Sequence, residues 1–208
     1  ELAALGVQVM QARSVEMGKK YDVPIRVRSS LNHSPGTLIT REVKAMENVL
    51  VRGVALNTAE AKVTLFGVPD RPGMASKIFK RLADANVNVD MIIQNKTDTQ
   101  ATDISFTVYK SDLRKALATV EEATRQLGAK RVSCDQNIAK VSVVGVGMRS
   151  HSGVASKMFG ALAKRKINID MISTSEIKIS CVIAGKDGKR ALRAIHQEFG
   201  LARNTKAA

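Results

Sequence analysis

The sequence predicts an α+β protein made of two similar βαββαβ units, packed side by side, with the first unit inserted into the second. Three observations support this prediction. They are an internal repeat, a change from strand-like to helix-like spacing of apolar residues within each copy, and an apolar, strand-like stretch that is surplus to the first copy. In the repeat, 11 of the 20 residues over 73–92 are identical to the residues 80 positions later. Such a match indicates two copies of one folded unit.

Each copy opens with an apolar run that suits a buried strand and leads through a glycine into a helix. The strands are expected over residues 61–68 and 139–146. After Gly73 and Gly153, apolar residues recur at the i, i+3, i+4, i+7 spacing that places them on one face of a helix. These residues are Ala75, Ile78, Phe79 and Leu82 in the first copy, and Ala155, Met158, Phe159 and Leu162 in the second.

Two further strands and a second helix follow in both copies. The strands are expected over 87–94 and 103–109 in the first copy and over 167–174 and 178–184 in the second, with helices over 113–127 and 189–199. A last strand over 130–133 gives the first copy the order βαββαβ, the ferredoxin-like split βαβ unit. Because the offset between the copies falls from 80 to 75, the first copy has five extra residues around 96–100, where a hairpin loop tolerates insertion.

The second copy lacks a final strand of its own, because only a polar tail, 200–208, follows its last helix. The apolar stretch 49–55 lies ahead of the first copy much as 131–133 lies ahead of the second. We predict that 49–55 completes the second sheet, whose edge would otherwise remain unpaired. The domains are then 58–138 for the first unit and 46–57 plus 139–208 for the second.

Residues 1–45 lie outside the repeat. A helix is expected over 7–20 and strands over 24–27 and 37–40, joined by a segment rich in turn-forming residues. These elements bury too little to form a domain, so they are interpreted as the edge of a neighbouring one. The first residue is Glu rather than Met, which suggests a fragment.

Composition excludes several classes of protein. The formal net charge is +14, with most of the excess in the last third of the chain, where a solvated helix face is favoured over a binding patch. Only 3% of residues are aromatic, which argues against a sheet that stacks nucleic-acid bases. Cys134 and Cys181 fit no metal spacing and are expected to be reduced thiols lining the core. No apolar run long enough for a membrane span and no secretory leader occurs, so no membrane partner is expected and the cytoplasm is the default location.

The glycine at each strand-to-helix junction is the centre of the candidate function. Free N–H groups at a helix N-terminus suit a carboxylate, and Asp70 beside them suits an ammonium group, so the loop before Gly73 has the features of an amino-acid receptor. In the alternative interpretation, Gly73 is only a turn residue and Asp70 only neighbours the helix cap. The repetition of the feature, with Asn-(Val/Ile)-Asp fifteen residues later in both copies, favours binding. No Walker loop, Ser-His-Asp set or metal cluster is present, and His151 is a lone imidazole that lines a pocket or faces solvent.

Several motifs resemble a known family. The stretch 68–73 and the helix after it resemble the opening of an ACT domain, a βαββαβ module that binds amino acids. The tandem arrangement, with 88–95 in one copy and 171–176 in the other, is similar to the regulatory region of aspartate kinases, and 11–39 resembles the end of their kinase domain. The Lys-Phe-Gly-Gly-Thr-Ser type motif that opens that domain is absent, so the chain is not expected to phosphorylate aspartate alone. The parent enzyme would use ATP and Mg²⁺, and this chain would bind no cofactor itself.

The resemblance implies two effector sites at the interface between ACT domains. A threonine-like site would use Asp70, Gly73, Met74, Ala75 and Gln94, joined by Asn168 and Ile169 of the other domain. A second site, with lysine as the candidate ligand, would use Met148, Ser150, His151, Gly153, Val154 and Ala155, joined by Asn88, Val89, Asp90, Ser175 and Glu176. No catalytic residue and no metal ligand is assigned.

The resemblance also implies partners: a homodimer through the ACT domains, and a kinase domain or catalytic subunit subject to concerted feedback inhibition. Met46 is a candidate start of a separately translated regulatory subunit. Three alternatives remain open at this point. They are an ACT module of another enzyme or transcription factor, a nucleic-acid binder that uses the basic C-terminal third, and a dimerisation module that binds no ligand.

Overall fold

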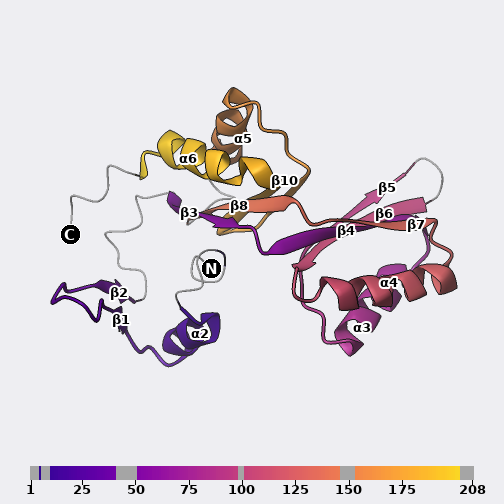
Figure 1. Ribbon diagram of the computed structural model, residues 1–208, viewed down its shortest axis with the longest axis horizontal. Coiled ribbons are helices and arrows are strands. Elements are labelled where there is room, and N and C mark those ends of the chain that lie inside the picture. The colour runs from indigo at the N-terminus through magenta and orange to yellow at the C-terminus, as the bar shows by residue number, and fades with distance from the viewer. Residues whose placement is uncertain (1–4, 6–9, 41–50, 98–100, 146–152, 202–208) are drawn as a thin grey trace.

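The computed structural model describes residues 5, 10–40, 51–97, 101–145 and 153–201. It contains two α+β domains joined end to end and a smaller N-terminal segment beside the second of them (Figure 1). The helices of the two domains lie on opposite sides of their sheets in this view. None of the helices in the described ranges is both long and apolar enough to cross a membrane.

The first domain is a four-stranded antiparallel sheet with two helices on one face. Its sheet has the order β5-β6-β4-β7. Its elements are β4 (Glu60–Pro69), α3 (Met74–Asp84), β5 (Val89–Lys96), β6 (Ala101–Tyr109), α4 (Leu113–Leu127) and β7 (Arg131–Asp135). The core contains the predicted helix residues Ile78 and Leu82, packed against Val63, Leu65 and Phe106 of the sheet.

The second domain repeats this arrangement, but its fourth strand precedes the first domain in the sequence. Its elements are β8 (Ile138–Gly145), α5 (Val154–Lys164), β9 (Met171–Thr174), β10 (Lys178–Ala184), the 3-10 turn η2 (Gly185–Asp187) and α6 (Gly188–Glu198). Strand β3 (Val51–Asn57) pairs with β8, with Val54 opposite Val143, and gives the order β3-β8-β10-β9. The predicted fold, with one βαββαβ unit inserted in the other, is therefore confirmed; residues 49 and 50 of the predicted strand lie outside the described ranges.

The N-terminal segment consists of α2 (Ala12–Lys20) and a hairpin of β1 (Ile25–Val27) and β2 (Thr37–Ile39). The helix predicted over 7–20 begins later than expected among the residues that the structure describes. Gln11 is extended, with φ −64° and ψ 119°, so the helix begins only at Ala12, while residues 7–9 lie outside the described part.

Three local predictions need correction. Strand β9 begins at Met171, because Asn168 and Ile169 precede the paired residues rather than joining the sheet. The extra residues of the first copy do not only enlarge a loop: β5 and β6 have 8 and 9 residues, whereas β9 and β10 have 4 and 7. Cys134 is exposed on β7 rather than in the core. Cys181 is buried as expected, and its burial raises the pKa of its thiol to about 12.

Candidate functional site

The end of β4 is shaped by a β-bulge just before the predicted ligand loop. The pairing of β4 with β6 shifts register between Leu65 and Val68. Gly67 has the left-handed φ of +64°, and its N–H donates to the Asp103 carboxylate at 2.9 Å. A bulge with glycine in this conformation bends its strand and changes the direction of the following residues. The bulge therefore sets the course of the chain from Val68 into the loop that contains Asp70.

Gly73 ends this loop as the N-cap of α3. Its φ of +87° lies in the region that only glycine adopts without a steric cost. No atom lies within 4 Å of the position that a Cβ would take, so the loop borders open space. The first N–H groups of α3 have no partner within the helix and present a partial positive charge there.

A cavity of about 380 Å³ lies in front of this helix end. It brings together five residues predicted for the threonine-like site, which are Asp70, Gly73, Met74, Ala75 and Gln94. Thr102 and Ile104 of β6, which sequence reasoning did not include, also line it. Gln94 reaches this wall because it lies opposite Ile104 in the pairing of β5 with β6.

Asp70 already has a cationic partner. Lys96 Nζ lies 2.8 Å from its carboxylate, and this hydrogen bond together with the charge of Asp70 raises the pKa of Lys96. Lys96 is 72% exposed, so solvent screens the pair and keeps it weak. A ligand ammonium group can therefore replace Lys96 at Asp70 at little cost.

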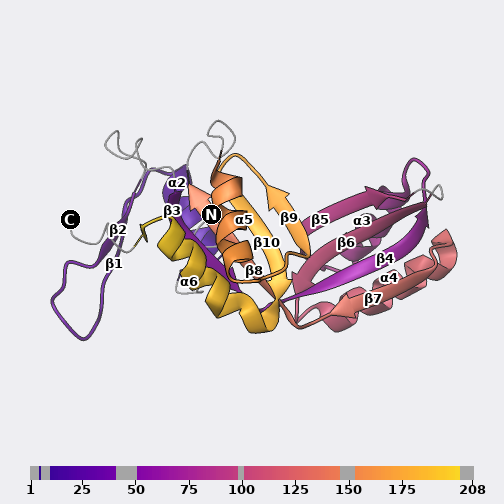
Figure 2. The ribbon, with the colours of Figure 1, turned by 90° about the horizontal axis from the view of Figure 1, so that it is seen from above.

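Asn168 and Ile169 do not line this cavity. Ile169 packs against the core of its own domain, and the next residue, Asp170, forms an ion pair with Lys62 at 3.0 Å. Lys62 lies near the start of β4, whereas the cavity lies beyond its end. Figure 2 shows the β4–α3 loop at the end of the first domain that points away from the second. Within one chain, the two parts of the predicted site are therefore at opposite ends of β4.

The second predicted site shows the same separation. Gly153, with φ +101°, caps α5, but the Val154 side chain is buried in the core, and Met148, Ser150 and His151 lie outside the described residues. Ser175 and Glu176 form the β9–β10 turn. The Gly145 N–H donates to the Ile177 carbonyl at 3.0 Å, so this turn adjoins the end of β8 that leads toward α5.

Asn88, Val89 and Asp90 lie elsewhere, in a cavity of about 400 Å³ between the two domains. Leu5 of the N-terminal part of the chain lines it as well, and the other lining residues are Glu60, Val108, Tyr109, Lys140 and Lys178. Lys140 is 2% exposed and forms ion pairs with both Glu60 and Asp90. Burial alone would lower the pKa of Lys140, but its hydrogen bonds to Asp90 and Glu60 and their charges raise it overall.

The interface between the domains contains two equivalent ion pairs. Lys62 of β4 bonds Asp170 of the second domain, and Lys140, which has the same place in β8, bonds Asp90 of the first. A small apolar cluster, formed by Met91, Ile138, Met171 and Val182, lies between them. The signal for this interface was in the repeat, because a lysine follows the first alanine of each opening strand and both copies contain Asn-x-Asp.

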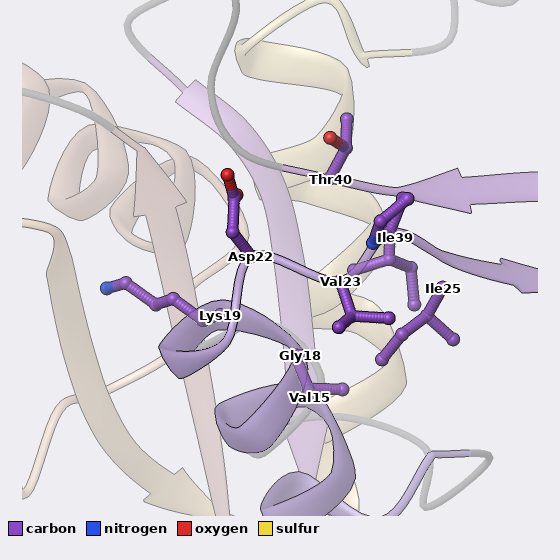
Figure 3. Close-up of a pocket in the computed structure, with 9 residues that line it drawn as sticks. Val15, Gly18, Lys19, Asp22, Val23, Ile25, Ile39 and Thr40 are labelled. Atoms are coloured by element: carbon purple, nitrogen blue, oxygen red, sulfur yellow. The ribbon is translucent and has the colours of Figure 1, made fainter.

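The N-terminal segment has a cavity of its own, of about 590 Å³. Figure 3 shows Val15, Val23, Ile25 and Ile39 gathered between α2 and the hairpin. Further large apolar side chains of this segment are exposed, namely Met17, Tyr21, Leu31 and Leu38. No group of three or more metal-ligating side chains occurs here or elsewhere among the described residues.

Comparison with known proteins agrees with this architecture. The model of the ACT domain family matches residues 63–124 and 141–199. An aspartate kinase of Pseudomonas putida is 52% identical over 202 residues, which are 97% of the chain and 49% of that protein. The chain thus spans about half the length of the curated relatives that it matches.

Solved structures give the same picture. The regulatory subunit of aspartate kinase from Thermus thermophilus, in its ligand-free form, is 43% identical with a TM-score of 0.69, over 72% of this chain and 99% of that one. A crystal structure of aspartokinase alpha and beta subunits contains a chain that is 47% identical with a TM-score of 0.67, over 72% of this chain and 99% of that one.

Proposed function

Because the chain belongs to the aspartokinase family and contains its paired ACT domains, we propose that it is the effector-sensing region through which free threonine and lysine inhibit an aspartate kinase. The parent enzyme would transfer phosphate from ATP to a carboxylate in the presence of Mg²⁺, in the cytoplasm. Its catalytic half would correspond to the part of the relatives that this chain does not match. This region itself would bind effectors and transmit their presence.

The β4–α3 cavity is the observation that supports this proposal most directly. An α-amino acid carries an ammonium and a carboxylate on one carbon, and the cavity wall has a complementary pair of groups: the Asp70 carboxylate and the N–H groups at the start of α3 that have no partner within the helix. Gln94 adds an amide that can recognise a hydroxyl group, which agrees with threonine. The start of α5 would form the equivalent site in the second domain, with lysine as its candidate ligand.

Each site would be completed by a second copy of the chain. Asn168 and Ile169 lie at the end of the second domain that faces Lys62, so they cannot close the β4–α3 cavity of their own chain. A two-fold dimer, in which the second domain of one copy lies beside the first domain of the other, would place them there.

The N-terminal segment would join the sensor to the kinase. The apolar residues around its cavity are the kind of surface that a neighbouring domain covers. Effectors would then act by favouring a dimer geometry in which the catalytic halves are held inactive. Coupling of this kind is typically about 1–3 kcal/mol per effector.

Calorimetric titration with threonine tests the sensor. We expect the chain to bind threonine, and Asp70→Ala to weaken the affinity at least about tenfold, because the ligand ammonium loses its charged acceptor. Asp84→Ala is the matched control, since Asp84 lies on the exposed side of α3 and pairs with Lys80 at 2.7 Å. Equal threonine affinities in the two variants, or no binding to the unmodified chain at millimolar concentration, would contradict the proposal.

A further inference from the structure

Lys96 places a cation on the acceptor that the proposed ligand needs. Its Nζ lies 2.8 Å from Oδ2 of Asp70, the carboxylate assigned to the ligand ammonium group. The Asp70 side chain is 32% exposed, so a ligand can reach this carboxylate from the cavity. The ammonium group of a free amino acid has the same charge and the same kind of N–H donor as Lys96. Two such groups on one carboxylate repel each other, so the ligand binds best when Lys96 leaves.

The pairing of β5 with β6 explains why Lys96 lies at the cavity. Lys96 follows Gln94 by two residues, and side chains two positions apart in a strand point to the same face of the sheet. Gln94 pairs with Ile104, and Lys96 pairs with Thr102. Gln94 and both partner residues line the cavity, so the strand directs the Lys96 side chain to its rim.

The repeat does not carry this lysine into the second copy. The residue 80 positions after Lys96 is Glu176, a side chain of opposite charge. Strand β9 also ends at Thr174, before this position, whereas β5 includes Lys96 as its last residue. The cation beside the ligand loop is therefore a feature of the first domain alone.

We propose that Lys96 is an intramolecular competitor of the effector, whose ammonium group holds Asp70 until a ligand ammonium displaces it and so lowers the affinity of the β4–α3 cavity for free amino acids. This inference rests on the proposed sensor and deepens it. Lys96 is largely exposed, so its side chain can move into solvent when the ligand arrives. Solvent also screens the pair, so the competition should change the affinity by a factor of only about two to five.

Calorimetric titration of the whole chain with threonine tests the competitor. Lys96→Met keeps a long side chain but removes its charge, so threonine affinity should rise about two- to fivefold. Lys96→Arg keeps the charge and should leave the affinity close to that of the unmodified chain. Lys80→Met is the matched control and should not change the affinity. Lys80 is 71% exposed, against 72% for Lys96, and forms a similar ion pair with Asp84 on α3.

The Asp70→Ala background shows whether the effect depends on Asp70. With that carboxylate removed, Lys96→Met should no longer raise the threonine affinity. A gain of the same size in both backgrounds would overturn the proposal, because the lysine would then act without competing for Asp70.

Salt provides a second measurement. Threonine exchanges one ion pair for another in the unmodified chain but forms a new one in Lys96→Met, so the gain in affinity should shrink as sodium chloride is added. A gain that does not depend on salt would contradict the competition.

The outcomes separate this inference from the sensor itself. If neither the unmodified chain nor Lys96→Met binds threonine, the sensor at the β4–α3 loop is refuted. If both bind threonine with equal affinity, only the competitor is refuted. Weaker binding to Lys96→Met would also refute it, because Lys96 would then help to hold the ligand.

Discussion

Lys62 and Lys140 occupy the same place in the two repeats but have different environments. Lys62 is 23% exposed and bonds one carboxylate, whereas Lys140 is 2% exposed and lies between two. The difference arises at Glu60, because the residue in its place in the second copy is the apolar Ile138. The two lysines therefore have the same place in the fold but differ in burial and in the number of carboxylate partners.

Replacing each lysine by methionine tests this difference. Lys140→Met leaves buried Glu60 without a cation and should lower the free energy of unfolding by about 3–5 kcal/mol. Lys62→Met breaks a partly exposed pair and should cost no more than about 1 kcal/mol. Urea unfolding of the two variants measures both values. Similar losses in the two variants would contradict the burial argument.

The pH dependence of this difference follows from the raised pKa of Lys140. A lysine whose pKa is higher in the folded state stabilises the fold below its unfolded pKa of 10.5, and that contribution is lost as pH rises through the folded value. The difference in the free energy of unfolding between the unmodified chain and Lys140→Met should therefore stay constant from pH 7 to about pH 9. It should become smaller in more alkaline solution. Unfolding curves at several pH values check this expectation.

The residue scale is also where sequence reasoning had its limits. Asp70, Gly73 and Gln94 could be placed in one cavity because the glycine, the helix spacing and the family motif all lie within a short stretch. Glu60 and Lys140 are far apart in the sequence and each is flanked by strand residues, so their pairing depends on how two domains meet. Nothing in the spacing of either strand indicates that contact.

At the scale of single elements, β3 shows that the order of segments in the sequence differs from their grouping into domains. It precedes the first domain in the chain, but pairs with β8 along six residue positions of the second. Val51 also contributes to the second hydrophobic core. The prediction succeeded because a missing edge strand and a surplus strand could be matched, whereas the start of β9 was missed because Ile167 is buried without belonging to the strand.

A proline in β3 tests which domain the strand stabilises. Val54→Pro places a proline, with its fixed φ and its ring, opposite Val143 and should disturb the pairing with β8. Hydrogen–deuterium exchange measured by mass spectrometry should then show faster exchange in β8 and β10, with β4 and β6 unchanged. Faster exchange confined to β4 and β6 would place the strand with the first domain instead.

At the scale of the whole molecule, the outward position of the β4–α3 loop matters most. The β4–α3 loop lies at the far end of the first domain, and the interface between domains is occupied by ion pairs and the Met91 cluster (Figure 2). Residue assignments carried over from the family combine segments of both domains, and within one chain Asn168 and Ile169 do not line the β4–α3 cavity. Which copy of the chain would supply each segment is a property of the assembly, and a single sequence does not contain it.

Mixing two defective variants tests the shared sites. Asp70→Ala and Asn168→Ala should each lose threonine affinity when prepared alone. In a two-fold dimer with shared sites, a mixed dimer has one site with both mutations and one with neither, so about a quarter of all sites should recover after exchange of subunits. Calorimetry after mixing measures this recovery, with analytical ultracentrifugation to confirm dimers. No recovery in a sample that contains mixed dimers would show that each site belongs to one chain.

The path of the chain through β3 also determines the order of events during synthesis. The ribosome makes β3 first, then the entire first domain, and only afterwards β8, the strand with which β3 pairs. The first domain can therefore fold on the nascent chain before β3 has its partner strand. The ribosome adds roughly 5–20 residues per second, so several seconds pass between the synthesis of β3 and that of β8. During that interval the apolar residues of β3 have no partner strand, so a chaperone that covers β3 would protect the chain until β8 is made.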